Sequence, residues 1–253
     1  MNSRRAATLR EMGLAPLWKL RRTEQQPLAT QQAVAAQQPA EEQPAAAAPT
    51  AAAVDVAERA AAIAQMDWPQ LARAVADCRA CALCEGRQQA VLGSGDLHPD
   101  WLFVGEGPGA EEDRKGEPFV GQAGRLLDAM LAAIELERKR NVYIANTVKC
   151  RPPDNRTPEA EEIAACRPYL ERQIELLAPK LIVALGKPAT QTLLGREAKI
   201  GAERGKRHDY RGIHLIVTYH PAYLLRDPRQ KKEAWTDLQI AMRELGLKPP
   251  GKE

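Results

Sequence analysis

Four short apolar runs alternate with longer amphipathic segments in the C-terminal part of this chain. The runs are rich in β-branched residues and almost continuously apolar, which is typical of parallel strands buried on both faces. They are WLFVGE at 101–106, VYIANTV at 142–148, LIVALG at 181–186 and HLIVTYH at 214–220. Strands that alternate with helices predict a three-layer α/β/α sandwich around a central, mainly parallel four-stranded sheet.

The amphipathic segments between and after these runs predict helices. We expect helices at 67–77, 122–136, 159–177, 187–194 and 229–245. Before the third of them, Thr157 has the character of an N-cap and Pro158 that of a first helical residue. Ligands bind at the carboxyl ends of the strands in sheets of this kind. Polar and glycine-rich residues follow the predicted strands at Glu106-Gly107-Pro108-Gly109, Asn146, Gly186 and His220-Pro221.

Composition divides the chain into three regions. Residues 1–22 are basic, and their apolar residues could share one face of a short helix, so they are either a partner-binding peptide or a dispensable extension. Residues 23–66 consist mainly of Ala, Gln, Pro and Glu, and so few large apolar side chains predict a disordered linker. Residues 67–247 are expected to form the folded domain.

The chain contains no apolar run long enough to cross a membrane, and no apolar run follows the N-terminal arginines as in a secretory signal. Five cysteines, an odd number with three of them closely spaced, make a poor disulfide framework. We therefore expect a cytoplasmic protein with no membrane contact, and a monomer.

The cysteines are the strongest candidates for a metal centre. They are Cys78, Cys81, Cys84, Cys150 and Cys166, and the first three form a CxxCxxC sequence. Four thiolates can hold an iron–sulfur cluster or a tetrahedral zinc ion, and the spacing alone favours neither. It also does not decide whether Cys81 or Cys84 is the spare thiol. Buried free cysteines are the third reading, but packing alone seldom produces such a spacing.

A glycine-rich turn, GEGPG, follows the first strand, and on its own it is a weak indication of a ligand site. Together with five other segments, however, it resembles the family 4 uracil-DNA glycosylases, the iron–sulfur type of bacteria and archaea. The resemblance runs from Cys78 to about Leu245. The six segments, in order, are CRACALCEGR, VGEGPGAEED, GEPFVGQAGRLL, NTVKCRPPDNRTPEAEEIAAC, LIVALGKPA and TYHPAYLLR.

The resemblance implies an enzyme of base excision repair that releases uracil from single- or double-stranded DNA and leaves an abasic site. It implies a location in the bacterial cytosol or nucleoid. It also implies a structural [4Fe–4S] cluster, with Cys78, Cys81, Cys150 and Cys166 as the matching ligands and Cys84 as the spare thiol.

Uracil must leave the base stack before its glycosidic bond can be reached, and the bond then breaks toward a cationic sugar and a uracil anion. Phe119, in a polar glycine-flanked loop, is suited to stack on the base. The Asn146 carboxamide matches the N3–H and O4 edge of uracil, although the flipped amide would suit cytosine. The resemblance implies that His220 donates a hydrogen bond to uracil O2, with neutral or cationic imidazole. The alternatives are a core Phe, a turn-capping Asn and a structural His.

Three residues are candidates for the group that assists bond breaking. Glu106 is the first candidate, but a better-known branch of the family has an aspartate at the next position, where this chain has Gly107. Glu112 is the second candidate, and the alternative for it is a solvated charge. Asn155 is the third, as an amide that positions water.

Residues after His220 are candidates for DNA contact. Leu224 or Leu225 is a candidate wedge between bases, and Arg226 a phosphate ligand, although the same residues could simply begin an amphipathic helix. Residues 196–232 contain ten Lys or Arg and four Asp or Glu. Their basic residues are candidates for a phosphate-contacting face, namely Arg204, Lys206, Arg207, Arg211, Arg226, Arg229, Lys231 and Lys232.

No lysine nucleophile for strand cleavage is evident, although Lys149 is near the predicted site. Two other functions remain open on the sequence. One is an iron–sulfur protein that binds nucleic acid but has lost activity with the aspartate, and the other is a zinc-bound scaffold domain.

Overall fold

A computed structural model of the chain describes residues 51–249. Within these residues the strands form one six-stranded sheet in the order β1-β3-β2-β4-β6-β5. The strands are β1 (Ser94–Gly95), β2 (Trp101–Gly105), β3 (Val142–Asn146), β4 (Leu181–Leu185), β5 (Arg207–Tyr210) and β6 (Ile213–Thr218). The four inner strands are parallel, as predicted, and the two edge strands pair antiparallel. The predicted α/β fold is confirmed, with two short edge strands added.

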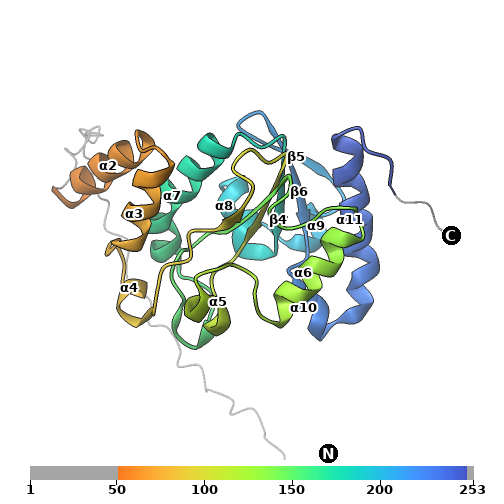
Figure 1. Cartoon of the computed structure of the whole chain (residues 1–253), viewed down its shortest axis with the longest axis horizontal. Helices are drawn as coiled ribbons and strands as arrows, with labels where there is room; N and C mark the ends of the chain where they lie inside the picture. Colours follow the sequence, from red (N-terminus) through yellow and green to blue (C-terminus); the bar gives the residue numbers. More distant parts are fainter. Residues whose placement is uncertain (1–50, 250–253) are drawn as a thin grey trace, which may run out of the picture. The chain divides into compact units, whose positions relative to one another are not determined.

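Helices cover both faces of the sheet (Figure 1). The α-helices are α2 (Ala51–Ala64), α3 (Trp68–Ala76), α4 (Leu83–Gly86), α5 (Ala110–Lys115), α6 (Gln122–Ala132), α7 (Ala160–Leu177), α8 (Lys187–Leu194), α9 (Ile200–Glu203), α10 (Pro221–Arg226) and α11 (Lys231–Glu244). Two 3₁₀ turns are η1 (Pro153–Asn155) and η2 (Pro228–Gln230). The five predicted helices correspond to α3, α6, α7, α8 and α11, with ends that differ by up to four residues.

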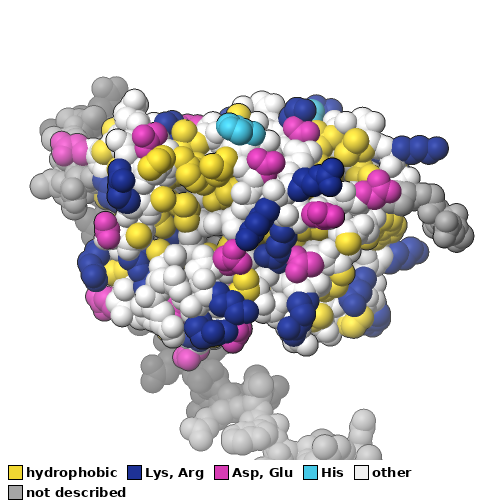
Figure 2. Space-filling model, in the orientation of Figure 1, with side chains coloured by type: hydrophobic (Ala, Val, Ile, Leu, Met, Phe, Trp, Pro, Cys, Tyr) yellow, Lys and Arg dark blue, Asp and Glu magenta, His cyan; other side chains and the backbone are white. Residues whose placement is uncertain are grey.

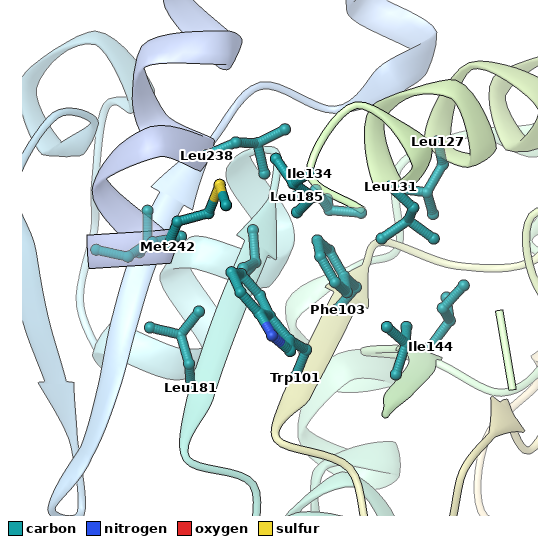
Figure 3. Close-up of a cluster of buried hydrophobic side chains, with 14 of the residues drawn as sticks. Trp101, Phe103, Leu127, Leu131, Ile134, Ile144, Leu181, Leu185, Leu238 and Met242 are labelled. Carbon is teal, nitrogen blue, oxygen red and sulfur yellow. The ribbon is translucent and has the colours of Figure 1, made fainter. Parts of the chain in front are cut away.

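Alternate residues of the inner strands point into two separate cores, because successive side chains of a strand face opposite sides of the sheet. On one face Trp101 and Phe103 pack against α6 and α11 (Figure 3). On the other face Leu102 and Val104 pack against α7 and α8. Both faces are buried, which explains why these strands are continuous apolar runs rather than alternating ones.

The region predicted as a linker, 23–66, is helical at its C-terminal end, where α2 spans Ala51–Ala64. Alanine is the best helix former, and Ile63, only 2% exposed, attaches the helix to a third apolar cluster with α3 and α7. The linker is therefore shorter than predicted at this end. The predicted segment 1–22 and the rest of the linker lie outside the described residues.

The start of α7 also differs from the prediction. Its N-cap is Glu159, whose backbone N–H donates to Glu162 in a capping box, rather than Thr157. Thr157 and Pro158 instead belong to the loop before the helix, and both line the site described below. Among the described residues, no helix is long and apolar enough to cross a membrane.

Candidate functional site

A cavity of about 350 Å³ opens at the carboxyl ends of β2, β3 and β6. In parallel α/β sheets, ligands bind at this end of the strands. It is lined by eight of the nine predicted catalytic and substrate-binding residues. These are Glu106, Gly107, Glu112, Phe119, Asn146, Asn155, His220 and Arg226. The ninth, Leu224, lies elsewhere. The cavity is called the base pocket below.

The Phe119 loop forms one wall of the base pocket. Phe119 has φ 55°, in the left-handed region that a bulky residue rarely adopts, and the residue is 6% exposed. Close approach of the loop requires glycine at two neighbouring positions. A Cβ at Gly105 would lie 2.6 Å from the Phe119 ring, and one at Gly124 would lie 1.6 Å from the Phe119 carbonyl oxygen. The glycines therefore fix where the aromatic ring stands.

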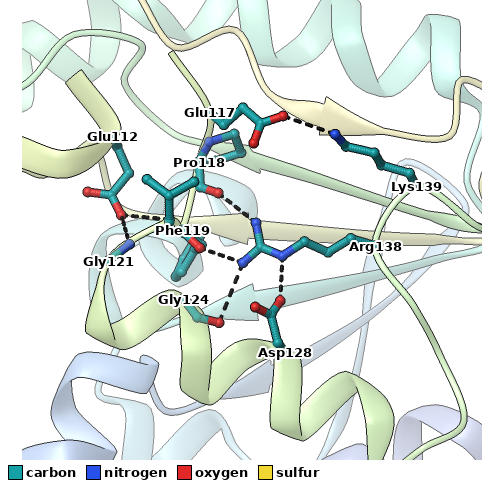
Figure 4. Close-up of polar contacts among 10 residues, drawn as sticks. Glu112, Glu117, Pro118, Phe119, Gly121, Gly124, Asp128, Arg138 and Lys139 are labelled. Atoms are coloured by element: carbon teal, nitrogen blue, oxygen red, sulfur yellow. Dashed lines mark hydrogen bonds and ion pairs between the residues drawn. The ribbon is translucent and has the colours of Figure 1, made fainter. Parts of the chain in front are cut away.

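Glu112, the second predicted carboxylate, is bound to the backbone of the glycine-rich loops (Figure 4). Its Oε1 accepts from the N–H groups of Val120 and Gly121, both at 2.9 Å, and its Oε2 accepts from Gly109 N–H at 3.1 Å. Both carboxylate oxygens thus have protein donors. This arrangement suits a residue that holds the loop rather than one that activates water.

Asn146 is the last residue of β3 and is 2% exposed. Its Oδ1 has no hydrogen-bond partner among the described residues, although buried acceptors are nearly always paired. Its backbone oxygen accepts from the buried Lys149 ammonium at 2.8 Å. An unpaired amide acceptor on the wall of the base pocket is suited to receive an N–H group of a bound base.

His220 ends the loop after β6 and caps α10. Its Nδ1 accepts from Ala222 N–H at 3.1 Å, which places the proton of a neutral imidazole on Nε2. Burial lowers the pKa of His220 to about 4, assisted by the positive charge of Arg226 and opposed by Glu112. The ring stands 5.4 Å from that of Phe119, centroid to centroid. The contact at Nδ1 and the lowered pKa both favour a neutral imidazole with its proton on Nε2 at neutral pH.

Glu106 directly follows β2 and is half-buried in the base pocket. Burial raises its pKa above the ordinary value, while the nearby Thr157 side chain and the charge of Arg226 act in the opposite direction. Unlike Glu112, it has no side-chain hydrogen bond from a backbone N–H among the described residues. Sequence reasoning missed Thr157 as a partner of Glu106, because Thr-Pro-Glu is also a common helix start.

Asn155 lies in η1 at the rim of the base pocket and has φ 55°. Its Oδ1 accepts from Arg151 Nε at 2.8 Å, which leaves the amide NH₂ for another partner.

Leu224, predicted as a candidate wedge between DNA bases, does not lie at the surface. Leu224 is 1% exposed and belongs to the interior of the domain, so it cannot enter a base stack without leaving its packing. Its neighbour Leu225 is 37% exposed and remains a candidate. Arg226 lines the base pocket, with its guanidinium carbon 6.0 Å from the centre of the Tyr223 ring.

Four of the eight residues of the predicted basic face form ion pairs with acidic residues. Arg204 binds Asp237 and Glu233, and it is only 14% exposed. Three further arginines of the set also form ion pairs, namely Arg207 with Glu244, Arg211 with Glu171 and Arg229 with Asp227. On the face drawn in Figure 2, Lys and Arg side chains likewise stand beside Asp and Glu side chains. Half of the candidate phosphate-contacting residues are thus already paired with acidic side chains of the protein.

All five cysteines line a second cavity, between α3, α4 and α7, which is called the cysteine cavity below. Its walls also carry positive groups and donors. Arg87 Nη1 donates to Cys150 Sγ at 2.8 Å, and the backbone N–H of Lys149 donates to Cys166 Sγ at 3.3 Å. The Arg59 guanidinium, from α2, lies 3.9 Å from Cys78 Sγ. Sequence reasoning missed both arginines.

The cysteine sulfurs are poorly placed as free thiolates. Burial raises the pKa of Cys166 to about 12, and burial also raises the pKa of Cys81 and of Cys150. Among residues 51–249, no three His, Cys, Asp or Glu side chains converge closely enough to hold one metal ion. All five sulfurs nevertheless gather at one cavity, with N–H donors beside two of them, as in sites that bind a group through thiolates.

Comparison with known proteins agrees with this geometry. A family model described as the Uracil DNA glycosylase superfamily matches residues 92–239. A type-4 uracil-DNA glycosylase of Pyrobaculum aerophilum is 44% identical over 183 residues, which cover 69% of this chain and 93% of that protein. One from Thermotoga maritima is 48% identical over 155 residues, which cover 60% and 80%. A type-5 uracil-DNA glycosylase of Pyrobaculum aerophilum is 33% identical over 146 residues, which cover 51% and 64%.

Proposed function

The chain belongs to the type-4 uracil-DNA glycosylases, and we propose that its base pocket hydrolyses the N-glycosidic bond of deoxyuridine in DNA. Uracil is released, and an abasic site remains for base excision repair. The observation that carries this proposal is the unpaired Oδ1 of Asn146, a residue that lines the same cavity as Phe119 and His220.

Recognition of the base rests on Asn146 and Phe119. The Asn146 Oδ1 accepts from uracil N3–H, and its NH₂ group donates to O4. The Phe119 ring stacks on the face of the flipped base, as aromatic side chains do in other sites that receive extruded nucleotides. The bond from Lys149 Nζ to the Asn146 backbone oxygen holds the end of β3 and therefore the amide.

Departure of the base is assisted by His220. Negative charge accumulates on uracil O2 as the glycosidic bond breaks, and the neutral Nε2–H donates a hydrogen bond to it. Because Nδ1 is held by Ala222 N–H, the donor is oriented before the substrate arrives.

The developing positive charge on the sugar is stabilised by Glu106, which also orients the attacking water. Glu106 is the carboxylate in the base pocket whose side chain is not already bound to backbone N–H groups. Glu112 instead positions the loop through its three backbone contacts. The free NH₂ of Asn155 assists in placing the water. Thr157 orients the Glu106 carboxylate.

We further propose a [4Fe–4S] cluster on Cys78, Cys81, Cys150 and Cys166, with Cys84 as the spare thiol. The buried sulfurs, their N–H donors and the adjacent cations fit such a group. When bound, it would cross-link the segment after α3 to the segment after β3 and to α7. Zinc is the alternative, and a visible absorbance band near about 400 nm separates the two, because d¹⁰ zinc is colourless.

The partner is uracil-containing DNA, single- or double-stranded, with Leu225 as the wedge and Arg226 at a phosphate. Segment 1–22 remains a candidate for binding a protein partner, and a pull-down with and without residues 1–50 tests it. We propose a monomer that acts in the cytoplasm.

The function is tested by incubating the cluster-loaded protein with an oligonucleotide that contains one uracil and then adding alkali, which cuts the strand at abasic sites. Matched oligonucleotides with thymine or cytosine at the same position serve as controls. Only the uracil strand should break, and Asn146→Ala should slow the reaction about 100-fold. No strand break with the wild-type protein would overturn the proposal.

A further inference from the structure

The loop that carries Phe119 is held from two sides by side chains of opposite charge (Figure 4). The Glu112 carboxylate takes the N–H groups on the C-terminal side of Phe119, as described above. On the other side, Arg138 donates from Nη1 to the Pro118 carbonyl oxygen at 2.9 Å and from Nη2 to that of Phe119. Nη2 also lies 3.4 Å from the Gly124 carbonyl oxygen.

The loop needs such partners because of its backbone conformation. With φ 55° at Phe119, the neighbouring peptide groups cannot pair as they would in a helix or a strand. A carboxylate can only accept hydrogen bonds and a guanidinium can only donate them, so the two side chains bind different backbone groups of the loop. Glu112 satisfies the N–H groups, and Arg138 satisfies the carbonyl groups.

The Arg138 side chain is itself held by an acidic residue. Its Nε donates to the Asp128 carboxylate in α6, and its side chain is 21% exposed. The next residue, Lys139, forms an ion pair with Glu117 at 3.0 Å, which ties the same two segments together at the surface. The segment between α6 and β3 is thereby attached to the loop that contains Phe119, about twenty residues earlier in the chain.

We propose that Arg138 is a positioning residue for base recognition: it holds Phe119 in the left-handed conformation that presents the ring to the flipped uracil. This inference rests on the function proposed above and names a determinant of the same site. Arg138 touches no substrate and acts through the Phe119 carbonyl. The centroids of the Phe119 and His220 rings are 5.4 Å apart. The loss of Arg138 therefore disturbs both the stacking surface and the surroundings of the imidazole.

A double-mutant cycle separates positioning from general stabilisation. Phe119→Ala and Arg138→Gln should each lower kcat/KM on uracil-containing DNA about 10- to 100-fold, because a small misplacement of a binding group has effects of this size. Because Arg138 acts through Phe119, the double variant should be no slower than Phe119→Ala alone. Arg140→Gln, which changes an exposed arginine two residues away, is the control and should keep wild-type kinetics. Additive losses in the double variant, or unchanged kinetics of Arg138→Gln, would overturn the proposal.

A second measurement does not depend on catalysis. The chain has four histidines, so the imidazole proton resonances are few, and His220→Gln identifies the one of interest. Arg138→Gln should shift the His220 resonance through the displaced Phe119 ring, whereas Arg140→Gln should not. An unshifted resonance contradicts the proposal. If the wild-type protein releases no uracil, the proposed function fails, and this resonance alone decides the role of Arg138.

Arg138→Lys keeps the charge but cannot reach two carbonyl oxygens with a planar fork. It should keep the ion pair with Asp128 and recover only part of the lost kcat/KM. If Arg138→Gln does not fold, the same cycle and the same resonance are measured with Arg138→Lys. Full wild-type behaviour of the lysine variant in both measurements would show that charge alone suffices and would overturn the positioning role.

Discussion

The base pocket and the cysteine cavity lie at the two ends of the short segment from Asn146 to Cys150, yet they are built in opposite ways. In the base pocket, backbone groups already satisfy Glu112 and one nitrogen of His220, and Asn146, whose Oδ1 is unpaired, lines the cavity. In the cysteine cavity, sulfurs with raised pKa are buried together. The first region is organised by the chain itself, whereas we propose that the second is completed by a bound group.

This difference predicts that the two regions respond differently to substitution. Changes in the base pocket should reduce catalysis and leave the fold intact. Changes in the cysteine cavity should reduce stability first and catalysis as a consequence.

The largest effect is expected from Cys166→Ser. Cys166 is buried and accepts from Lys149 N–H, so the loss of this ligand removes both the proposed cluster and its cross-link. The free energy of unfolding should fall by more than about 4 kcal/mol, together with loss of visible absorbance. Cys84→Ser is the matched control and should keep both properties. Thermal unfolding and iron analysis check this, and equal behaviour of the two variants would contradict the assignment of Cys84 as the spare thiol.

Glu106→Gln tests the base pocket. It removes the carboxylate proposed to stabilise the cationic sugar, and kcat should fall about 10³-fold. Because burial raises the pKa of Glu106, the folded state disfavours its charge, so the amide variant should be at least as stable as the wild type at pH 7. Glu111→Gln, an exposed neighbour, should change neither property. Single-turnover kinetics and thermal unfolding measure both effects, and a variant with full activity would exclude Glu106.

The pH dependence of stability should reveal His220. Its pKa is about 4 in the folded state and about 6.5 when unfolded, so the unfolded state binds more protons between these values. Stability should therefore be complete above pH 6.5 and fall by at most about 3 kcal/mol as the pH drops toward 4. His220→Gln should flatten this part of the profile. Chemical denaturation at several pH values tests it, and identical profiles for both proteins would contradict a neutral buried imidazole.

The smallest effect is expected at the contact that joins the two regions. Lys149→Met removes the hydrogen bond to the Asn146 backbone oxygen but keeps most of the length of the side chain. We expect kcat/KM to fall about 10-fold, because Asn146 is held less firmly, while the visible absorbance stays. Loss of the absorbance with unchanged kinetics would instead assign Lys149 to the cysteine cavity alone.

The same two regions show how much the sequence could predict. The four inner strands were predictable because both faces are buried, and the polar residues at their ends gave Asn146 and His220. The edge strands were not, because Ser94–Gly95 and Arg207–Tyr210 carry almost no apolar residues. Helix α2 was missed because an Ala-rich composition, with Ile63 as its main buried anchor, resembles a linker.

Residues that act through backbone contacts left no pattern in the sequence. Arg138 binds carbonyl oxygens of a loop about twenty residues earlier, and Arg87 binds a sulfur 63 residues later. Only the folded chain brings these groups together. Likewise, Leu224 and Leu225 are equivalent in sequence, and their burial alone separates a core residue from a candidate wedge.

The most direct test of uracil excision is the identification of both products by mass spectrometry. A duplex with one uracil is incubated with the wild-type protein, and the released base and the DNA strand are analysed without alkali. Free uracil and an equal amount of intact strand that contains one abasic site are the expected products. Release of no uracil, or a strand already cut at that position, would contradict it.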